Sequence, residues 1–392
     1  MKKFSIIYFL AVAAFGFGIV GVASAEAAGV VSLTFDDGNA SQYSTIRPLL
    51  LSKGQKGVFY VNSGLVGQAS YMTWAQLTDL KKAGFEIAGH TSNHVELPTL
   101  SLSQMRTEIN GDYSAFVARG ITPTNFAAPF GAYDNISLSL VAKRYNSHRA
   151  FANQGLNFWP YNKYLLYVRY VTNQTSVDQA KAWVDEAQAQ NGWLVLVFHE
   201  ILTPVDPEDT YSWTIEQFTA FLDYLNSKQI VTKNIDEVLK DFTNLIPNSS
   251  FENGLASWIT DNATSTVLNI SSNGSYPTPK NSIRMAGTTN KPSHLFSPKV
   301  AIDSSKTYGV RTYIDSRNLT SGEIGFYVDE YDTNGNWTSG KWLGALYGKN
   351  VIDYSYVYTP SSSNVKSASV QIYMTAGTRG SVFLDNVELF AR

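Results

Sequence analysis

The sequence predicts an α/β fold, a distorted (β/α) barrel of about seven parallel strands, followed by an all-β sandwich. Two observations lead to this prediction. From about Val30 to Asp241, short apolar runs alternate with helical segments. After Phe242, Ser, Thr, Asn and Gly separate short alternating runs, and no helical pattern follows. A length of 392 residues also fits about two domains.

The candidate barrel strands are short apolar runs, and helical segments separate them. Several of these helices open with a capping box, in which a hydroxyl accepts a backbone N–H and a Gln reaches back. Strict alternation implies a parallel sheet, either open or closed into a barrel. The strands are Val30–Phe35, Gly57–Val61, Glu86–Ala88, Asn125–Ala127, Ser147–Ala150, Tyr167–Val171 and Trp193–Phe198, and the capping pairs are Thr73/Gln76, Ser101/Gln104, Ser176/Gln179 and Thr214/Gln217.

The sandwich strands are predicted after a short polar stretch, Asn244–Ser250, that contains a proline. We place the domain boundary there, with residues 26–243 as the barrel domain and 244–392 as the sandwich. The alternating runs are Thr307–Tyr313, Gly322–Tyr331, Tyr354–Tyr358, Ala368–Met374 and Val382–Leu389.

The N-terminus has the pattern of a secretory signal peptide at residues 1–25. Met1-Lys2-Lys3 is followed by an uncharged apolar run and then by Ala23-Ser24-Ala25. The run is also long enough to approach a membrane span, so an uncleaved anchor helix is the alternative. In both cases we expect a secreted or cell-surface protein, which meets the membrane only through this segment.

The charge and cysteine content exclude several classes of function. The net charge is -2, with no basic excess to neutralise a phosphate backbone, so nucleic acid is not an expected partner. Cys is absent, which removes disulfides, thiolate metal sites and cysteine nucleophiles. Only five His are present, so any clustering among them is informative.

Polar side chains follow three of the predicted barrel strands. The stretches are Thr34–Gly38, His90–His94 and His199-Glu200. Parallel strands of such a barrel all end on one face, which carries the active site. We therefore expect convergence of Asp36, Asp37, His90, His94 and His199.

Two imidazoles and one carboxylate would leave an open position on a divalent cation, where a water becomes a nucleophile. Asp36 and Asp37 are adjacent at a strand end and point in different directions, so one can ligate while the other accepts a proton. A further His can then donate a proton to the leaving group. Taken singly, the Asp pair could instead cap a helix, and His90 and His94 could be ordinary core or surface residues.

These stretches resemble the motifs of a known family. Thr34–Gly38 and His90–His94 look like the first two motifs of polysaccharide deacetylases, which form carbohydrate esterase family 4 with the NodB-like fold. Phe126–Gly131 resembles the third motif and Val197-Phe198-His199 the fifth. The resemblance covers about 30–239 in the same motif order.

The resemblance implies a role for each matching residue. Asp37, His90 and His94 would bind a divalent metal, usually zinc, with cobalt or nickel as alternatives. Asp36 would be the general base that activates the attacking water. His199 would be the general acid for the departing amine or alkoxide.

The third and fifth motifs imply residues around the acetyl group, and the third motif differs from the family at one position. The backbone N–H of Phe130 would help to stabilise the oxyanion, and Val197 would help to wall the acetyl pocket. The family usually has an Arg where this chain has Ala127. Arg149 or Arg169, each near a predicted strand, could supply that charge to Asp36; ordinary surface pairing is the alternative. The fourth motif has no clear match.

The second region resembles carbohydrate-binding modules of the jelly-roll, galactose-binding-like kind. The resemblance rests on Asn248–Trp258 at its start and Val382–Leu389 at its end. It would allow a structural calcium ion near Glu252 and Asp385, whose oxygens suit that cation.

Aromatic side chains could provide a platform for the flat faces of sugar rings. Candidates are Trp337 and Trp342, in a stretch with Tyr347 that we expect to be a loop, and Trp159 in the barrel, which could equally pack in the core. Tyr354, Tyr356 and Tyr358 share one strand face by their spacing, and packing is the favoured interpretation for them.

The leading functional expectation is a secreted, monomeric, metal-dependent deacetylase that acts on N-acetyl groups of GlcNAc polymers such as chitin or peptidoglycan. The alternatives are an acetylxylan O-deacetylase, a catalytically impaired glycan-binding protein, and another metallohydrolase on the same scaffold.

Overall fold

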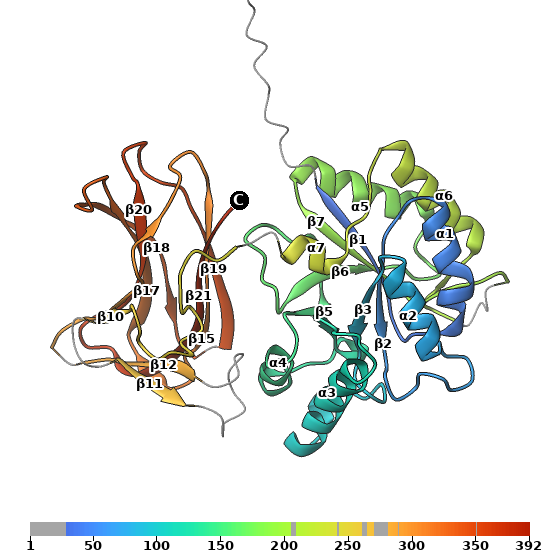
Figure 1. Ribbon diagram of the computed structural model, residues 1–392, viewed down its shortest axis with the longest axis horizontal. Coiled ribbons are helices and arrows are strands. Elements are labelled where there is room, and N and C mark those ends of the chain that lie inside the picture. Colours follow the sequence, from blue (N-terminus) through green and yellow to red (C-terminus); the bar gives the residue numbers. More distant parts are fainter. Residues whose placement is uncertain are drawn as a thin grey trace, which may run out of the picture.

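A barrel surrounded by helices lies beside a pair of stacked β-sheets in the computed structural model (Figure 1). The structure describes residues 29–204, 209–240, 243–260, 265–269, 281–288, 290–349 and 351–392. The predicted signal segment, residues 1–25, lies outside these ranges. No helix in the described ranges combines the length and the apolar character needed to cross a bilayer.

The parallel sheet is closed into a barrel, which decides between the two forms that the sequence allowed. The strands follow chain order, and β1 pairs in parallel with both β2 and β7. The predicted seven-stranded barrel is therefore confirmed. Its strands are β1 (Val30–Phe35), β2 (Val58–Val61), β3 (Glu86–Gly89), β4 (Asn125–Ala127), β5 (Ser147–Gln154), β6 (Leu166–Tyr170) and β7 (Trp193–Phe198).

Helices cover the outside of the barrel. Both hydrogen bonds of the capping box form at α2, α3 and α6, and Ser176 accepts the Gln179 amide at α5. These caps satisfy N–H groups that would otherwise lack partners at the helix starts. The helices are α1 (Arg47–Ser52), α2 (Trp74–Lys82), α3 (Leu102–Val117), α4 (Asn135–Ala142), α5 (Val177–Gln190), α6 (Ile215–Ser227) and α7 (Ile235–Leu239).

The barrel strands are buried on both faces, which explains their continuous apolar runs. In β7, Leu196 and Phe198 belong to the cluster between barrel and helices. The alternating residues Val195 and Val197 belong to a separate cluster inside the barrel, together with Tyr60. Beyond the end of β7, the chain forms a small two-stranded sheet from β8 (Glu200–Ile201) and β9 (Ser212–Trp213).

Two β-sheets form the second region and bury a shared apolar core. One contains β10 (Ile259–Thr260), β13 (Ser293–Phe296), β20 (Ser367–Met374), β17 (Glu323–Tyr331) and β18 (Trp337–Tyr347), with β14 (Val300–Ala301) paired to β20. The other contains β11 (Ser265–Asn269), β12 (Asn281–Ala286), β21 (Arg379–Ala391), β15 (Tyr308–Asp315) and β19 (Val351–Tyr358), with β16 (Leu319–Ser321) paired to β21. Phe326 and Ile372 of the first sheet and Ile314 and Leu384 of the second belong to one buried cluster.

One expectation for this region is wrong. Trp337, Trp342 and Tyr347 lie in strand β18 rather than in a loop. Register shifts between β17 and β18, at Phe326/Tyr327 and again at Glu330/Tyr331, interrupt the alternation by which a strand is recognised. Tyr354, Tyr356 and Tyr358 pack against the core, as predicted.

The sandwich contacts the barrel through the outer face of its second sheet (Figure 1). The Arg311 guanidinium donates to the Tyr161 carbonyl at 3.3 Å and, through Nε, to the Glu388 carboxylate at 2.7 Å. Ser355 donates to the Pro160 carbonyl at 3.2 Å. These contacts use the connection between β5 and β6, so the barrel occupies this face of the sandwich.

Candidate active site

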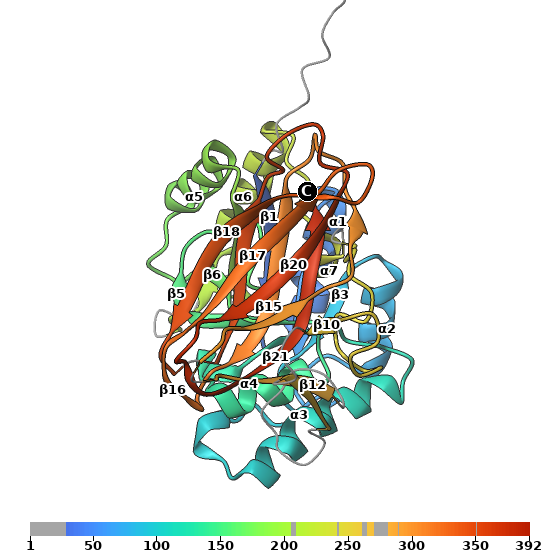
Figure 2. The same ribbon diagram turned by 90° about the vertical axis from the view of Figure 1, so that its left-hand side faces the viewer.

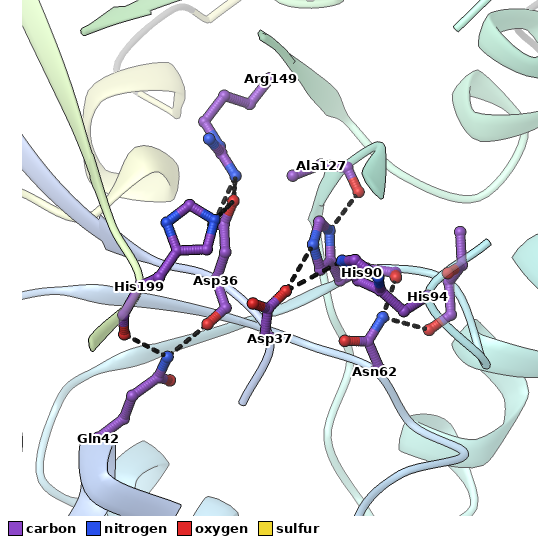
Figure 3. Close-up of polar contacts among 10 residues, drawn as sticks. Asp36, Asp37, Gln42, Asn62, His90, His94, Ala127, Arg149 and His199 are labelled. Atoms are coloured by element: carbon purple, nitrogen blue, oxygen red, sulfur yellow. Dashed lines mark hydrogen bonds and ion pairs between the residues drawn. The ribbon is translucent and has the colours of Figure 1, made fainter. Parts of the chain in front are cut away.

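The site lies where three barrel strands end. Asp36 and Asp37 follow β1, His90 follows β3, and His199 follows β7 (Figure 3). Asp37 has a φ of 77° and Gly38 one of 75°, so the chain turns sharply after the strand. A Cβ at Gly38 would come within 2.9 Å of the Val61 side chain, so this turn requires glycine.

Three potential metal ligands converge at this turn. The Asp37 Oδ1 atom lies 3.1 Å from His94 Nε2 and 3.4 Å from His90 Nε2. Asp37, His90 and His94 each offer one ligand atom, and these atoms all lie within 4.8 Å of one another. No other group of three or more His, Cys, Asp or Glu residues in the described ranges meets this criterion.

The surroundings hold both imidazoles toward the carboxylate. The His90 Nδ1 donates to the Ala127 carbonyl at 2.7 Å, and since a carbonyl only accepts, the Nε2 of a neutral ring keeps its lone pair. Asn62 donates to the backbone carbonyls of His90 and Thr91, which fixes the loop. The His94 ring packs against Phe130, with ring centroids 4.7 Å apart.

This donor set fits a divalent cation. Asp37 Oδ1 is buried and receives no well-aligned hydrogen bond, although two imidazole nitrogens lie beside it. Burial alone would raise the Asp37 pKa, but the contacts with His90 and His94 outweigh it and hold the pKa well below its usual value. A charged carboxylate and two imidazoles facing one small space are the N and O ligands of an open zinc-type site.

The second carboxylate of the pair faces a different partner. Both Asp36 oxygens lie 2.5 Å from Nη2 of Arg149, and both side chains are almost fully buried. The Arg149 guanidinium in turn lies 4.6 Å from the centre of the Tyr60 ring, which supports it as a cation–π contact. Arg169 instead pairs with Glu186 at 2.8 Å. Of the two arginines that the sequence offered, Arg149 is therefore the one that contacts Asp36.

The third histidine of the site, His199, lies next to Asp36. Its Nε2 lies 4.0 Å from Asp36 Oδ2. Gln42 donates to the backbone carbonyls of Asp36 and His199 and so ties the two strand ends together. Burial lowers the His199 pKa, against the opposing effect of Asp36. The ring of Tyr211, the residue immediately before β9, packs on the His199 ring, with ring centroids 4.8 Å apart.

One pocket of about 240 Å³ joins the two carboxylates, the three imidazoles and Arg149. Its lining residues are Asp36, Asp37, His90, His94, Ala128, Phe130, Gly131, Arg149, His199 and Tyr211. The pocket is large enough for a small acyl group, and it places Asp36 and His199, whose side chains can exchange protons, beside the candidate cation site.

Of the two residues that we expected around the acetyl group, one lines this pocket and the other does not. Phe130 is at its rim, in the short turn η3 (Pro129–Gly131), and its side chain is 60% exposed. Val197 is fully buried in the barrel interior and is not among the lining residues in the described part of the chain.

The remaining assigned residues lie away from the pocket. Trp159 packs edge-on against Phe390 of the sandwich, so it belongs to the contact between the two regions. Asp385 is buried and accepts the Asn386 amide, while Glu252 accepts the Asn281 amide. Neither carboxylate belongs to a cluster of three ligating side chains in the described ranges.

Sequence reasoning missed Gln42, Asn62, Tyr60 and Tyr211. Gln42 and Asn62 act on backbone carbonyls of distant strand ends, so no local pattern marks them. Tyr211 follows Asp209, whose carboxylate accepts the Tyr211 amide. Its position shortly after the His199 strand is the one signal that could have pointed to it.

Comparisons with known proteins point to the same region. The family model described as polysaccharide deacetylase matches residues 23–146. A chitin deacetylase of Arthroderma benhamiae is 30% identical over 122 residues, 30% of this chain and 32% of the relative. A chitin deacetylase of a Pestalotiopsis species is 29% identical over 109 residues, 28% of this chain and 36% of the relative.

A family 4 carbohydrate esterase from Streptomyces lividans, solved with acetate, aligns with a TM-score of 0.40 and 21% identity, covering 54% of this chain and 95% of its own. The chain spans less than half the length of the curated relatives it matches. The match to the family model includes the two stretches that carry Asp36, Asp37, His90 and His94. The similarity to polysaccharide deacetylases therefore lies in residues 23–146.

Proposed function

We propose that this chain is a metal-dependent deacetylase that hydrolyses N-acetyl groups of a GlcNAc-containing polysaccharide. One observation carries the proposal: the Asp37, His90 and His94 ligand set shares a pocket with a buried carboxylate and a buried imidazole, Asp36 and His199. The names of the chitin deacetylases among its relatives support the amide as the bond that is cut.

The residues present divide the work of amide hydrolysis among them. Asp37, His90 and His94 would hold the cation. When bound, a divalent cation makes a water easier to deprotonate and polarises the acetyl carbonyl. The Phe130 turn lies against His94, which supports a place for the acetyl oxygen beside the Phe130 amide.

Asp36 is the proposed general base. Its carboxylate does not point at the histidine pair but at Arg149, whose guanidinium holds it in place inside a buried pocket. The carboxylate takes one proton from the attacking water as the new C–O bond forms. Arg149 thereby sets the direction in which the Asp36 carboxylate points.

His199 is the proposed general acid. Its Nε2 faces the pocket 4.0 Å from Asp36 Oδ2. When the C–N bond breaks, the nitrogen of the departing amine needs a proton, and His199 supplies it. Acetate and the free amine of the sugar are the products, so the polymer gains one positive charge for each acetyl group removed.

Acetate release from N-acetylated chito-oligosaccharides by the full chain tests this proposal. Asp37→Asn and His94→Gln should each abolish release, because each removes one ligand. Asp178→Asn is the matched control, since Asp178 is an exposed carboxylate on α5 that pairs with Lys181 at 3.1 Å. Unchanged release in Asp37→Asn would refute the proposal.

The same assay separates the two linkages. Faster release from acetylated xylan than from the chito-oligosaccharides would make the enzyme an O-deacetylase. Binding to the polymer without release from either substrate would identify a non-catalytic glycan-binding protein.

We also infer export from the N-terminal segment, residues 1–25, by its charge and apolar pattern. N-terminal sequencing of the protein recovered from the medium should begin at Glu26. Recovery of the intact chain with the membrane fraction would instead identify an anchor.

A further inference from the structure

A short loop carries two of the three candidate metal ligands. His90 and His94 lie at its ends, and Thr91, Ser92 and Asn93 connect them. Thr91 has a φ of 65° and His94 one of 55°, in the left-handed region of the backbone. This conformation is uncommon outside glycine, and for a β-branched residue such as Thr91 it is an outlier. We call residues 90–94 the ligand loop.

Strained backbone persists only where the surrounding structure holds it in place, so the neighbours of the ligand loop matter. On the barrel side, the buried Asn62 donates to the carbonyls of His90 and Thr91 (Figure 3). The amide of Gly64 donates to the Ser92 carbonyl at 2.9 Å. A Cβ at Gly64 would lie 2.6 Å from that carbonyl oxygen, so the two backbones approach each other closely.

Helix α3 holds the loop from the other side. In Figure 1 and Figure 2 this helix lies at the lower end of the barrel. The Glu108 carboxylate accepts twice from Asn93, from the backbone amide at 3.0 Å and from the side-chain amide at 2.8 Å. The Glu108 backbone carbonyl accepts from the amide of Ser92 at 3.3 Å and from its hydroxyl at 3.2 Å. Glu108 therefore binds both residues that lie between Thr91 and His94.

A glycine lets the helix come this close to the loop. Gly111 follows Glu108 by three residues and lies on the same face of α3. A Cβ at Gly111 would come within 3.1 Å of the Ser92 Oγ. Glycine in a helix interior is less stable than alanine. The close approach to Ser92 gives a physical reason for its presence.

We propose that Glu108 is a positioning residue, which holds the ligand loop in the conformation where His90 and His94 face Asp37. Glu108 does not belong to the group of ligating side chains in the described ranges, so it acts on the ligands through Asn93 and Ser92.

The reason is preorganisation. A loop that is already held in its bound conformation loses less conformational freedom when an ion binds. Glu108 receives both N–H groups of the residue next to His94, which fixes the path of the backbone into that ligand. Residues that orient metal ligands in this way typically contribute about tenfold to a hundredfold to metal affinity.

This inference rests on the cation site of the proposed function but not on turnover, because zinc binding is measured without substrate. The test is the zinc dissociation constant of the full chain, from competition with a chromophoric chelator. Glu108→Ala should weaken zinc binding about tenfold or more.

Glu108→Gln should keep most of the affinity. Its amide oxygen can still accept the Asn93 backbone amide, and its NH₂ group can donate to the Asn93 side chain once that amide turns over. This conservative variant therefore separates hydrogen bonding from the negative charge of Glu108.

Two controls separate positioning from general stability. Thr107→Ala changes the adjacent residue of α3, whose hydroxyl donates to the Ser103 carbonyl within the helix, and it should bind zinc as the parent does. Urea unfolding of the metal-free proteins should show little change in Glu108→Ala. The reason is that Asn93 is exposed and that the loop can leave its strained conformation.

Parent-like zinc affinity in Glu108→Ala would overturn the inference and leave the deacetylase proposal standing. Equal losses in Glu108→Ala and Glu108→Gln would also overturn it, because the charge would then be responsible. No zinc binding by the parent would overturn both proposals. Weaker zinc binding by Glu108→Ala in a protein that releases no acetate would support the positioning role and count against the deacetylase alone.

Discussion

Replacing Arg149 with methionine would leave the Asp36 carboxylate buried without its cation. In the structure both carboxylate oxygens lie 2.5 Å from one guanidinium nitrogen, and the side chains are only 2% and 6% exposed. Removing one partner of such a buried pair costs about 3–5 kcal/mol of folding free energy if the remaining group stays charged. The alternative is that Asp36 takes up a proton, and then it can no longer serve as a base.

Arg149→Met should therefore reduce deacetylation by about 10²–10⁴-fold, the contribution of a general base. Acetate release, with urea unfolding of the same protein, gives the loss of activity and the change in stability.

Arg169→Met is the matched control. Arg169 pairs with Glu186, whose side chain is 37% exposed, and such pairs contribute about 0–1 kcal/mol. We expect its activity and stability to equal those of the parent. Full activity in Arg149→Met would refute the role given to this arginine.

Three further predictions concern metal binding, the general acid and stability. Zinc at a hundred times its Kd should stabilise the parent by about 2.7 kcal/mol in thermal unfolding and should not stabilise Asp37→Asn; equal stabilisation would exclude Asp37 as a ligand. Tyr211→Ala should lower kcat/KM about tenfold, because its ring supports His199, while Tyr211→Phe stays near the parent; equal loss in both would implicate the hydroxyl instead. Burial raises the pKa of Asp112 from 3.8 to about 6, despite hydrogen bonds from Ser63 and Tyr145. Because the folded protein binds this proton more tightly, Asp112 contributes about 3 kcal/mol to the free energy of unfolding below pH 3.8, and this contribution is lost as pH rises through 6. Urea unfolding at several pH values should show this decrease in the parent and not in Asp112→Asn. A decrease that persists in the variant would reject the assignment to Asp112.

The barrel and the convergence of its site could be predicted from sequence because both follow from strand order. Runs such as Trp193–Phe198 are apolar throughout, since parallel strands are buried on both faces. Once the strands are placed, Asp37, His90 and His199 must lie at the same end of the barrel. The convergence of these three residues could therefore be predicted without contact information.

The choice between Arg149 and Arg169 needed the structure. Successive residues of a strand point to opposite faces, and the stretch Ser147-His148-Arg149 has no apolar alternation that would set which side is inward. In the structure Ser147 and Arg149 point into the barrel, where they contact Asn125 and Asp36.

Strand β18 was also hidden from sequence reasoning. Gly340 and Gly344 and two register shifts against β17 break its alternation, so its exposed tryptophans look like loop residues. Other side chains approach both glycines closely: a Cβ would lie 3.2 Å from the Asp329 carboxylate at Gly340 and 2.8 Å from the Tyr356 hydroxyl at Gly344.

Titration of zinc into chelated protein, with acetate release from a chito-oligosaccharide as the readout, tests the central claim most directly. The claim is that Asp37, His90 and His94 form one cation site beside the Asp36 and His199 pair. Release should be absent in the chelated protein, rise with bound zinc and saturate at a single ion per chain. Full acetate release by the chelated protein would contradict the account.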